Sequence, residues 1–465
     1  MSETQSHLSG LYDIQAFGAV GDGVTVVTEA IQQAVNACHD AGGGTVLVPP
    51  GTYVTGTVYL KSHVTLHLCN GAKLLGSSRS EDYNADDIFP ENPHFSSENA
   101  SGAHLIIAYM ADHVAITGEG VIDGNSSTFF EPLPADEITL SYRSKTRNFP
   151  IKGWRPAQMV FFCRCSNVSV RDVSLNNAPY WTLFFLGCRS VQVRGVRVTN
   201  PPQTANGDGI DIDCCREVTV SDCIIHSGDD AITLRGYNSL LGEHEQPCEH
   251  VTICNCVLST PCCGMRVGVG GGTVRNCTIS NLVIKDTRTG INIISAYSAK
   301  WAGVTIENVR FSNVSMDTVV PLNILLGEHA RPPAAVRDLS FSHLRAIGRQ
   351  GSYIGGNEGQ HISGIHLHEV DLVMTGNDVD QGFAEKTPSP TGSNGVPAAL
   401  WVRHVDGLRL SGLRVEWQAA GDAWLAGIVV ERSGGVSLSE LEVPPPAGAA
   451  GESVRIEQVR DVRVR

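Results

Sequence analysis

Two acidic motifs follow each other at a short interval in the middle of the chain. They are NGDG at Asn206–Gly209 and SGDD at Ser227–Asp230, and Asp229 follows Asp208 by 21 residues. If that interval is one coil of a repeating β-structure, the motifs stack at about 4.8 Å, the spacing of neighbouring strands. Carboxylates gathered this closely raise the pKa of at least one of them, so a protonated acid stands beside ionised bases. Cleavage of a glycosidic bond needs that division of roles.

Two simpler explanations of these motifs stay open. Aspartate beside glycine is a common turn former, and clustered carboxylates also bind calcium. No Cys-x-x-Cys pair recurs in the chain with the spacing of a zinc site,. We therefore expect neither a bound metal nor a cofactor.

One phrase of alternating apolar and polar residues recurs along the chain. It begins at Val168, Val191 and Val218, starts that are 23 and 27 residues apart. Each phrase predicts two short strands with a turn between them. Repetition at this period without helices indicates an all-β solenoid, a single-stranded right-handed parallel β-helix, because parallel crossovers are right-handed. Further copies are VTICNCVL (251–258), GTVRNCTI (272–279), VTIENVRF (304–311), LRLSGLRV (408–415) and VSLSELEV (436–443).

One segment departs from the β pattern and predicts a helix over 25–41. Its apolar residues fall on one helical face, and the glycine run Gly42–Gly44 ends it,. A solenoid needs a cap on its exposed end, so we expect this short helix to be the N-terminal cap. We predict one domain over 10–465, with the cap at about 10–60, catalytic coils at about 160–310 and further coils to 465. Long loops are expected at about 78–102, 125–156 and 376–397.

Composition and charge exclude some classes of partner. The 465 residues carry a formal net charge of −14, which disfavours nucleic acid and anionic membranes. No apolar run is long enough for a membrane-spanning helix, and the first residues lack the basic and apolar regions of a signal peptide. We expect a cytoplasmic protein whose 14 cysteines are reduced and packed in strands,. The sequence leaves the oligomeric state open.

Several segments besides the acidic motifs resemble glycoside hydrolase family 28, the polygalacturonase family, in its bacterial branch. They are FGAVGDG at Phe17–Gly23, VPPGTY at Val48–Tyr53 and PYWTL at Pro179–Leu183. The resemblance covers roughly residues 10–345 and implies a pectate-lyase-like solenoid. The opening segment is shared with other β-helix enzymes, whereas the paired acidic motifs at this spacing are fairly specific.

The resemblance implies an inverting hydrolase and assigns roles to the acidic residues. Asp229, the first aspartate of the Gly-Asp-Asp motif, would be the general acid. Asp208 and Asp230 would activate the attacking water. Asn206 would orient the substrate or a carboxylate. Inversion requires acid and base carboxyls about 6.5–9.5 Å apart, which leaves room for the water.

The chain departs from the family at two motifs. Cys263 stands where the family has the histidine of Gly-His-Gly. Asn292 and Ile294 stand where it has the arginine and lysine of Arg-Ile-Lys, which bind the uronate carboxylate,. A buried carboxylate facing isoleucine would be unpaired, so a galacturonate in these subsites is disfavoured.

Other residues are candidates for contacts with the sugar. Arg266, Arg288 or Arg235 would supply a positive charge from another position, although each is also compatible with a solvated surface arginine. Asn292 suggests a neutral hydroxyl partner, and we include Cys263 among the substrate-binding candidates. Tyr297 and Trp301 are expected to stack on sugar faces, with core packing as the alternative.

Together these features predict a glycoside hydrolase whose partner is an oligosaccharide of the plant cell wall, related to pectin. We expect it to be exo-acting on imported fragments and not directed at standard polygalacturonan. A polysaccharide lyase or other β-helix carbohydrate-active enzyme is one alternative; a lyase needs an arginine or lysine base and often calcium. A non-catalytic carbohydrate-binding β-helix is another.

Overall fold

The computed structural model describes residues 10–84, 89–92, 98–138, 140–143, 147–297, 302–376, 395–418, 424–446 and 451–465. The chain divides into two compact units. The N-terminal unit comprises residues 1–140, 146–228 and 240–244, and the C-terminal unit comprises 141–145, 229–239 and 245–465. The single domain over 10–465 stays a prediction. Most of the loop expected at 376–397 lies outside the described residues.

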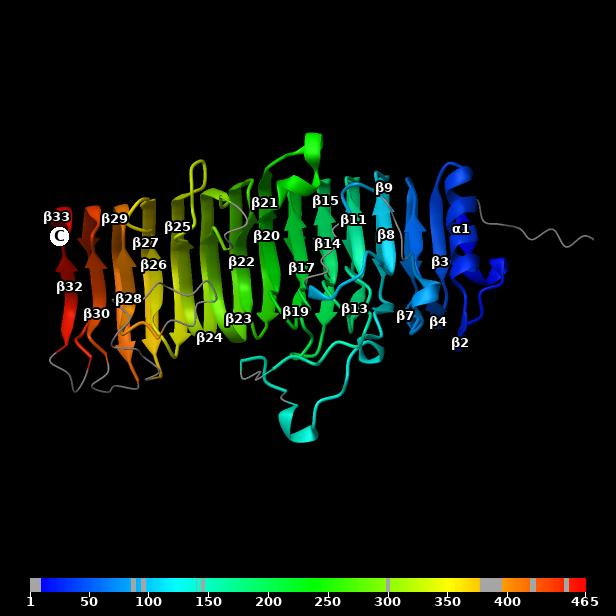
Figure 1. The fold of residues 1–465 in the computed structure, drawn as a ribbon, viewed down its shortest axis with the longest axis horizontal. Coiled ribbons are helices and arrows are strands. Elements are labelled where there is room, and N and C mark those ends of the chain that lie inside the picture. The colour runs from blue at the N-terminus through cyan, green and yellow to red at the C-terminus, as the bar shows by residue number, and fades with distance from the viewer. Residues whose placement is uncertain are drawn as a thin grey trace, which may run out of the picture. The chain divides into compact units, whose positions relative to one another are not determined.

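The N-terminal unit is built from short strands that repeat coil after coil (Figure 1). They are β1 (Leu11–Asp13), β2 (Asp22–Val26), β3 (Gly44–Val48), β4 (Gly51–Thr55), β5 (Val58–Leu60), β6 (Val64–Leu68), β7 (Ala72–Gly76), β8 (Ile106–Tyr109), β9 (Asp112–Gly118), β10 (Val121–Asp123), β11 (Val160–Cys163), β12 (Ser166–Arg171), β13 (Ser174–Asn176), β14 (Leu183–Leu186), β15 (Arg189–Arg194), β16 (Arg197–Thr199), β17 (Ile210–Asp213), β18 (Arg216–Ser221) and β19 (Ile224–His226).

These strands form three parallel columns, in which each strand pairs with its counterpart one coil away. The first runs β5–β8–β11–β14–β17, the second β1–β3–β6–β9–β12–β15–β18 and the third β2–β4–β7–β10–β13–β16–β19. In the second column Val168 pairs with Val191, and Val191 with Val218. The predicted spacings of 23 and 27 residues are therefore the lengths of two coils.

A helix lies at the N-terminal end of this unit, as predicted. It is α1 (Thr28–Asp40), the one α-helix among the described residues. It begins three residues later than expected because the chain before it forms β2. Its apolar face buries Ile31, Ala34, Val35 and Cys38 against the first coils, where it covers the end of the stack (Figure 1). Short 3₁₀ helices lie in connections: η1 (Ile14–Phe17), η2 (Ser80–Asp82), η4 (Ser126–Thr128), η5 (Ala135–Glu137), η6 (Asn238–Leu240) and η7 (Gly242–His244).

The C-terminal unit uses fewer but longer strands. They are β20 (Ile232–Gly236), β21 (Cys248–Ser259), β22 (Cys263–Gly270), β23 (Thr273–Ser295), β24 (Thr305–Leu326), β25 (Ala335–Gly348), β26 (Ser352–Gly355), β27 (Ile362–Met374), β28 (Ala398–Arg403), β29 (Val405–Trp417), β30 (Ala426–Glu431), β31 (Gly434–Ser439), β32 (Glu452–Glu457) and β33 (Arg460–Val464). They also pair in parallel with the next coil. Both units confirm the predicted all-β, single-stranded right-handed parallel β-helix.

The turn inside each repeated phrase is made by a residue with positive φ. In the N-terminal unit, Asp172 has φ 65° and separates β12 from β13. In the C-terminal unit, Asn255 has φ 56°, yet β21 continues through it. Asn281 Nδ2 donates to Asn255 Oδ1 (3.2 Å) one coil away. The predicted pairs of short strands are thus merged here into long bent strands, because the ladder continues across the turn.

The coils are filled by stacked apolar side chains. Phe162 and Phe185 stack with ring centroids 5.2 Å apart, close to the spacing of strands in a sheet. All 14 cysteines are free thiols, and most are buried, as the sequence predicted. Within the described residues, no helix has the length and hydropathy to span a bilayer.

Candidate active site

In the N-terminal unit, Asp208 occupies the turn before β17. Its side chain is almost enclosed, with a relative exposure of 5% for the residue. The carbonyl oxygen of Asp208 accepts a hydrogen bond from the Thr182 N–H (2.9 Å), one coil earlier. Nearby, the Gly228 N–H donates to the Gly207 carbonyl (2.9 Å). The glycines that precede Asp208 and Asp229 therefore face each other across one coil, as the 21-residue interval predicted.

Arg155 is the residue that organises this part of the N-terminal unit. It is fully buried, and it donates to the carbonyl oxygens of Pro179 (2.8 Å), Ala205 (2.7 Å), Glu98 (2.8 Å) and Asn99 (3.2 Å). Its Nη2 also donates to Asn206 Oδ1 (3.1 Å), and its guanidinium lies 4.8 Å from the Tyr180 ring centroid. Burial lowers the pKa of Arg155 to about 10. Arg155 thus ties four chain segments together and fixes the orientation of the Asn206 amide.

In the C-terminal unit, Asp229 and Asp230 form the turn before β20. Asp229 is half-buried and Asp230 is buried. The Asp230 N–H donates to Asp229 Oδ1 (2.9 Å). The Thr260 hydroxyl donates to the Asp229 carbonyl and accepts from the Cys262 N–H (3.0 Å). Thr260 therefore joins the acidic turn to the turn of the next coil.

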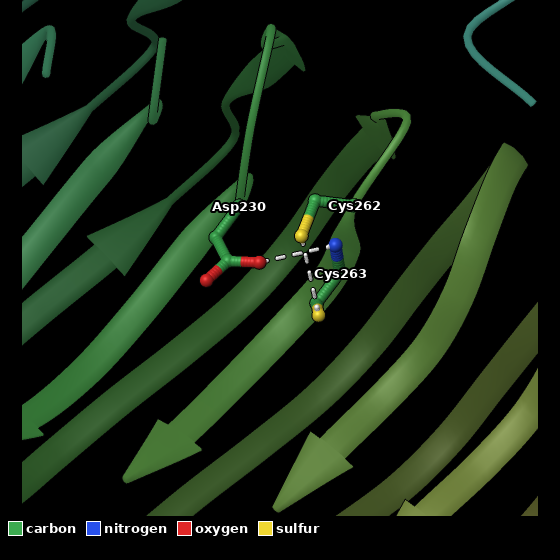
Figure 2. Close-up of side chains that lie close together, drawn as sticks. All are labelled: Asp230, Cys262 and Cys263. Atoms are coloured by element: carbon green, nitrogen blue, oxygen red, sulfur yellow. Dashed lines mark hydrogen bonds between the residues drawn. The ribbon is translucent and has the colours of Figure 1, made fainter. Parts of the chain in front are cut away.

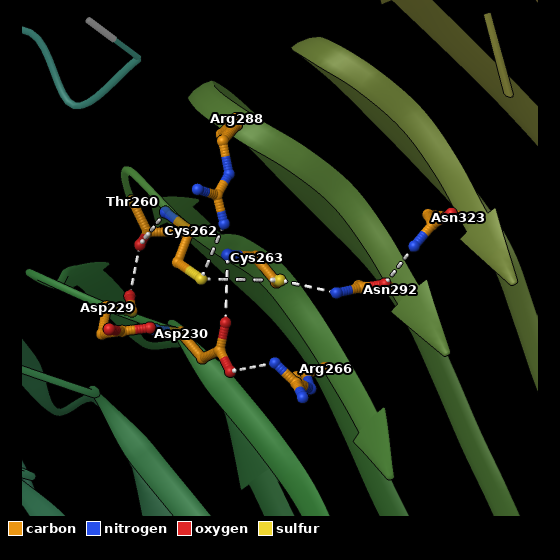
Figure 3. A network of polar contacts seen from close by, with 9 residues as sticks. All are labelled: Asp229, Asp230, Thr260, Cys262, Cys263, Arg266, Arg288, Asn292 and Asn323. Carbon is orange, nitrogen blue, oxygen red and sulfur yellow. Dashed lines mark hydrogen bonds and ion pairs between the residues drawn. The ribbon is translucent and has the colours of Figure 1, made fainter. Parts of the chain in front are cut away.

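The buried carboxylate of Asp230 has a positive and a neutral partner (Figure 3). Arg266 Nη1 lies 3.3 Å from Asp230 Oδ2, and the Cys263 N–H donates to Asp230 Oδ1 (3.1 Å). The guanidinium of Arg266 also lies 4.6 Å from the centroid of the Tyr297 ring. Arg266 is 7% exposed, whereas Tyr297 is 45% exposed. The sequence left open whether Arg266 is a surface arginine, and the structure shows an inward-facing one.

The two thiols beside Asp230 belong to a longer polar chain, drawn in Figure 3. Cys262 Sγ lies 3.8 Å from Cys263 Sγ and accepts a hydrogen bond from Arg288 Nη2 (3.2 Å). Asn292 Nδ2 donates to Cys263 Sγ (3.0 Å), and Asn292 Oδ1 accepts from Asn323 Nδ2 (2.9 Å). Side chains from several coils therefore meet at the end of the Asp230 turn.

Burial and neighbouring charges shift the pKa values of Cys262, Arg266 and Tyr297. The contact with Cys263 raises the pKa of Cys262 well above its usual range, and burial and the charges of Asp229 and Asp230 add to this. Burial lowers the pKa of Arg266, but the neighbouring acidic groups, Asp230 first among them, together outweigh burial and raise this pKa above its usual value. Burial raises the pKa of the Tyr297 hydroxyl. The site at neutral pH therefore holds a protonated Cys262 thiol beside charged arginines.

The sugar contacts of Cys263 and Asn292 stay predictions. Both residues are fully buried, and the Asn292 amide is engaged at its two ends. Their polar atoms therefore belong to the hydrogen-bond network of the chain itself. Ile294 is fully buried in an apolar cluster with Leu325 and Tyr353, so this position offers nothing to a charged sugar.

The remaining candidates fall in different places. Arg288 is half-buried beside Cys262, and Arg235 is buried in β20. Tyr297 keeps an exposed ring face, whereas Trp301 lies outside the described residues. Sequence reasoning missed Thr260, Cys262 and Asn323. Cys262 adjoins Cys263 in sequence and Thr260 lies three residues before it, which was a usable signal. The role of Asn323 follows only from its pairing with Asn292.

Part of one long loop docks beside the strand that carries Arg288. The Ser141 hydroxyl and the Tyr142 N–H donate to the carboxylate of Asp286 (2.8 and 2.9 Å). Arg143 Nη2 forms an ion pair with Asp317 Oδ1 (2.8 Å). Burial raises the pKa of Tyr142 to about 12. These contacts hold residues 141–143 against β23 and β24 of the C-terminal unit.

Comparison with known proteins identifies relatives of this chain. The model of the family described as Glycosyl hydrolases family 28 matches residues 73–387. A model described as Rhamnogalacturonase A/epimerase, pectate lyase-like, matches residues 12–81. A probable polygalacturonase of Vitis vinifera is 26% identical over 327 residues, 68% of this chain and 62% of that protein. An exo-poly-alpha-D-galacturonosidase of Dickeya chrysanthemi is 35% identical over 131 residues, 27% of this chain and 21% of that protein.

A solved structure shares the fold. The exopolygalacturonase from Thermotoga maritima superposes with a TM-score of 0.64 at 22% identity, over 78% of this chain and 87% of that one. The matched regions span less than two thirds of the length of these two curated relatives. The family model, however, matches more than half of the chain, so the chain belongs to glycosyl hydrolases family 28.

Proposed function

We propose that this protein hydrolyses O-glycosidic bonds in pectin-related oligosaccharides, with inversion at the anomeric carbon. The observation that carries the proposal is the Asp229–Asp230 turn. Asp230 is buried and ion-paired with Arg266, whereas Asp229 is half-buried and hydrogen-bonded through its backbone to Thr260. Two adjacent carboxylates thus stand in different environments, as a separate acid and base require.

The roles follow from these environments and from family membership. Asp229 donates a proton to the leaving glycosidic oxygen. Asp230, which is ion-paired with Arg266, acts with Asp208 as the base that takes a proton from the attacking water. Asn206 presents its Nδ2 donor, because Arg155 holds its Oδ1. One proton enters the leaving group, and one leaves the water.

The substrate is proposed to be a pectic oligosaccharide other than plain polygalacturonan. Ile294 lies in an apolar cluster and Asn292 is engaged by its neighbours, so these positions provide no cation for a uronate. Family relatives carry names such as polygalacturonase, which favours a pectin-derived chain.

A second candidate substrate is an oligogalacturonate held by different arginines. The Nε atoms of Arg266 and Arg288 have no hydrogen-bond partner within the described residues. An arginine with donors to spare suits a carboxylate. This candidate uses the same acid and base. It differs in placing a uronate carboxylate beside Arg266 and Arg288.

An exo mode on oligosaccharides inside a reducing compartment completes the proposal. The Dickeya chrysanthemi relative carries an exo-acting name. All 14 cysteines are free thiols, which fits a reducing compartment such as the cytoplasm.

The test is turnover of a panel of neutral and acidic pectic oligosaccharides by wild type and by Asp208→Asn, Asp229→Asn and Asp230→Asn. Each variant is expected to lose about 100- to 10,000-fold in kcat. The matched control is Asp222→Asn, the same chemical change at an exposed turn residue with φ 59°. Full activity in Asp229→Asn, or unsaturated products typical of a lyase, would refute the proposal.

A further inference from the structure

Asp230, Cys262 and Cys263 form a compact set of metal-ligating side chains (Figure 2). One carboxylate oxygen and the two sulfurs all lie within 4.8 Å of one another. Asp230 comes from the turn before β20, and the two cysteines come from the turn before and the start of β22. The proposed hydrolysis uses Asp230 but assigns no role to the thiols of Cys262 and Cys263.

The geometry points to a binding site for a thiophilic divalent cation of the zinc class at these three residues. Tetrahedral zinc with two sulfurs at about 2.3 Å sets those sulfurs about 3.8 Å apart. The two sulfurs here are 3.8 Å apart. Three protein ligands with a fourth position left for water is the pattern of an open zinc site. The sequence predicted no zinc site because the cysteines are adjacent, without the usual spacer residues.

Each of the three ligand groups is contacted by a hydrogen-bond donor from another side chain. Arg288 donates to Cys262 Sγ, Asn292 donates to Cys263 Sγ, and Arg266 pairs with Asp230 Oδ2. Outer donors of this kind orient metal ligands and stabilise their negative charge. Asn323 in turn holds the Asn292 amide. Each of the three ligand groups therefore has a polar partner that restricts its position.

Charge balance removes the objection that two arginines lie close by. The site carries one negative charge on Asp230 and two positive charges on Arg266 and Arg288. Binding Zn²⁺ releases two thiol protons to solvent, so the formal charge of the buried site does not change. A hard cation such as calcium displaces no thiol proton and would add two charges, and it prefers oxygen ligands.

The metal site shares Asp230 with the proposed hydrolysis, but the two proposals are tested by different measurements. A cation bound to Asp230 occupies the carboxylate that would activate water, so zinc should inhibit turnover. Metal affinity, however, is measured without substrate. The metal site and the hydrolase activity can therefore fail independently.

The experiment is titration of the reduced, metal-free protein with Zn²⁺ against a chromophoric chelator. We expect one zinc per chain, with release of two protons in weakly buffered solution. Co²⁺ should give the charge-transfer absorption of thiolate ligation. Cys262→Ser and Cys263→Ser should each weaken zinc binding by at least about 100-fold, and Asn292→Ala by about 10-fold, as for an outer-shell partner.

Cys254→Ser is the matched control, because Cys254 is a half-buried thiol of the same unit outside this cluster. It should bind zinc as wild type does. If the serine variants of the site do not fold, thiol alkylation is measured in the wild type instead. Zinc should slow the alkylation of Cys262 and leave that of Cys254 unaffected. Absence of zinc binding by the folded, reduced wild type would overturn the proposal. So would wild-type affinity in a folded Cys262→Ser variant.

Discussion

Arg155 in the N-terminal unit and Arg266 in the C-terminal unit are two buried arginines with similar surroundings at first sight. Each guanidinium lies over a tyrosine ring, at 4.8 Å from the Tyr180 centroid and 4.6 Å from the Tyr297 centroid. Their partners differ. Arg155 donates to neutral carbonyl and amide oxygens, whereas Arg266 faces the carboxylate of Asp230.

The two tyrosines differ in exposure. Tyr180 is fully buried in an apolar cluster with Trp181 and Phe184, and Tyr297 keeps an exposed face. Burial of an arginine therefore does not distinguish a structural role from a functional one. The two roles are distinguished by the charge of the arginine's partner and by the exposure of the tyrosine ring that it contacts.

A double-mutant cycle on Arg266 and Asp230 should give the largest effect. Arg266→Met leaves a buried carboxylate unpaired, and we expect a loss of about 3–5 kcal/mol in the free energy of unfolding. In the Asp230→Asn background the same change should have a much smaller effect. Turnover should fall at least about 100-fold in all three variants. Denaturant unfolding and initial rates measure both quantities, and additive stability losses would show that the two groups are not coupled.

Arg155→Met should act mainly on stability. Removing the guanidinium takes the donor from two buried carbonyl oxygens, those of Pro179 and Ala205. At about 1–3 kcal/mol each, we expect a loss of about 3 kcal/mol in the free energy of unfolding. Turnover of the folded fraction should fall by less than in Arg266→Met. Thermal unfolding with parallel assays checks this. A variant as stable as wild type but inactive would reverse the assignment of the two arginines.

Acid sensitivity of the N-terminal unit should come from His104. Burial lowers the pKa of His104 to about 4, against about 6.5 in the unfolded chain. The folded state thus takes up its proton later than the unfolded state as pH falls. The stability contribution is complete above pH 6.5 and decreases by about 1–3 kcal/mol as pH falls toward 4.

His104→Gln keeps a donor for the Gln158 carbonyl, which His104 Nδ1 contacts at 3.0 Å, and removes the titration. Its unfolding free energy should depend less on pH between 6.5 and 4 than that of wild type. An unchanged pH slope would assign the acid sensitivity to other groups.

The two tyrosine rings should give the smallest functional effect. Tyr297→Leu is expected to raise KM by about 2- to 10-fold, because a stacked ring contributes about 0.5–1.5 kcal/mol, and to leave stability within about 0.5 kcal/mol. Tyr180→Leu should lower stability instead, because Tyr180 is fully buried. Equal KM values for wild type and Tyr297→Leu would remove the ring from the sugar site.

The fold was largely predictable from the sequence, because each coil repeats the same local signals. Alternating apolar residues fix the strands, and a residue tolerant of positive φ, such as Asp172 or Asn255, marks the turn between them. The merging of strands in the C-terminal unit was not predictable, because it depends on the parallel pairing of β21 with β23, which continues on both sides of the turn at Asn255.

The sequence indicated the acidic motifs of the candidate site but not the contacts around them. β22 is buried along most of its length, so alternation gave no sign of the direction of Arg266. The link between Cys263, Asn292 and Asn323 depends on register, in which Arg266 pairs with Asn292 and Asn292 with Asn323. The sequence showed that Cys263 replaces the family's histidine, but it did not show that Asn292 is the partner of Cys263.

The most direct test of the central claim is the anomeric configuration of the fresh product. Proton NMR during the first minutes of hydrolysis of a defined pectic oligosaccharide reports it before mutarotation. The account predicts that the inverted anomer appears first, and that Asp229→Asn forms no product on the same timescale. A retained anomer, an unsaturated product, or undiminished turnover by Asp229→Asn would contradict it.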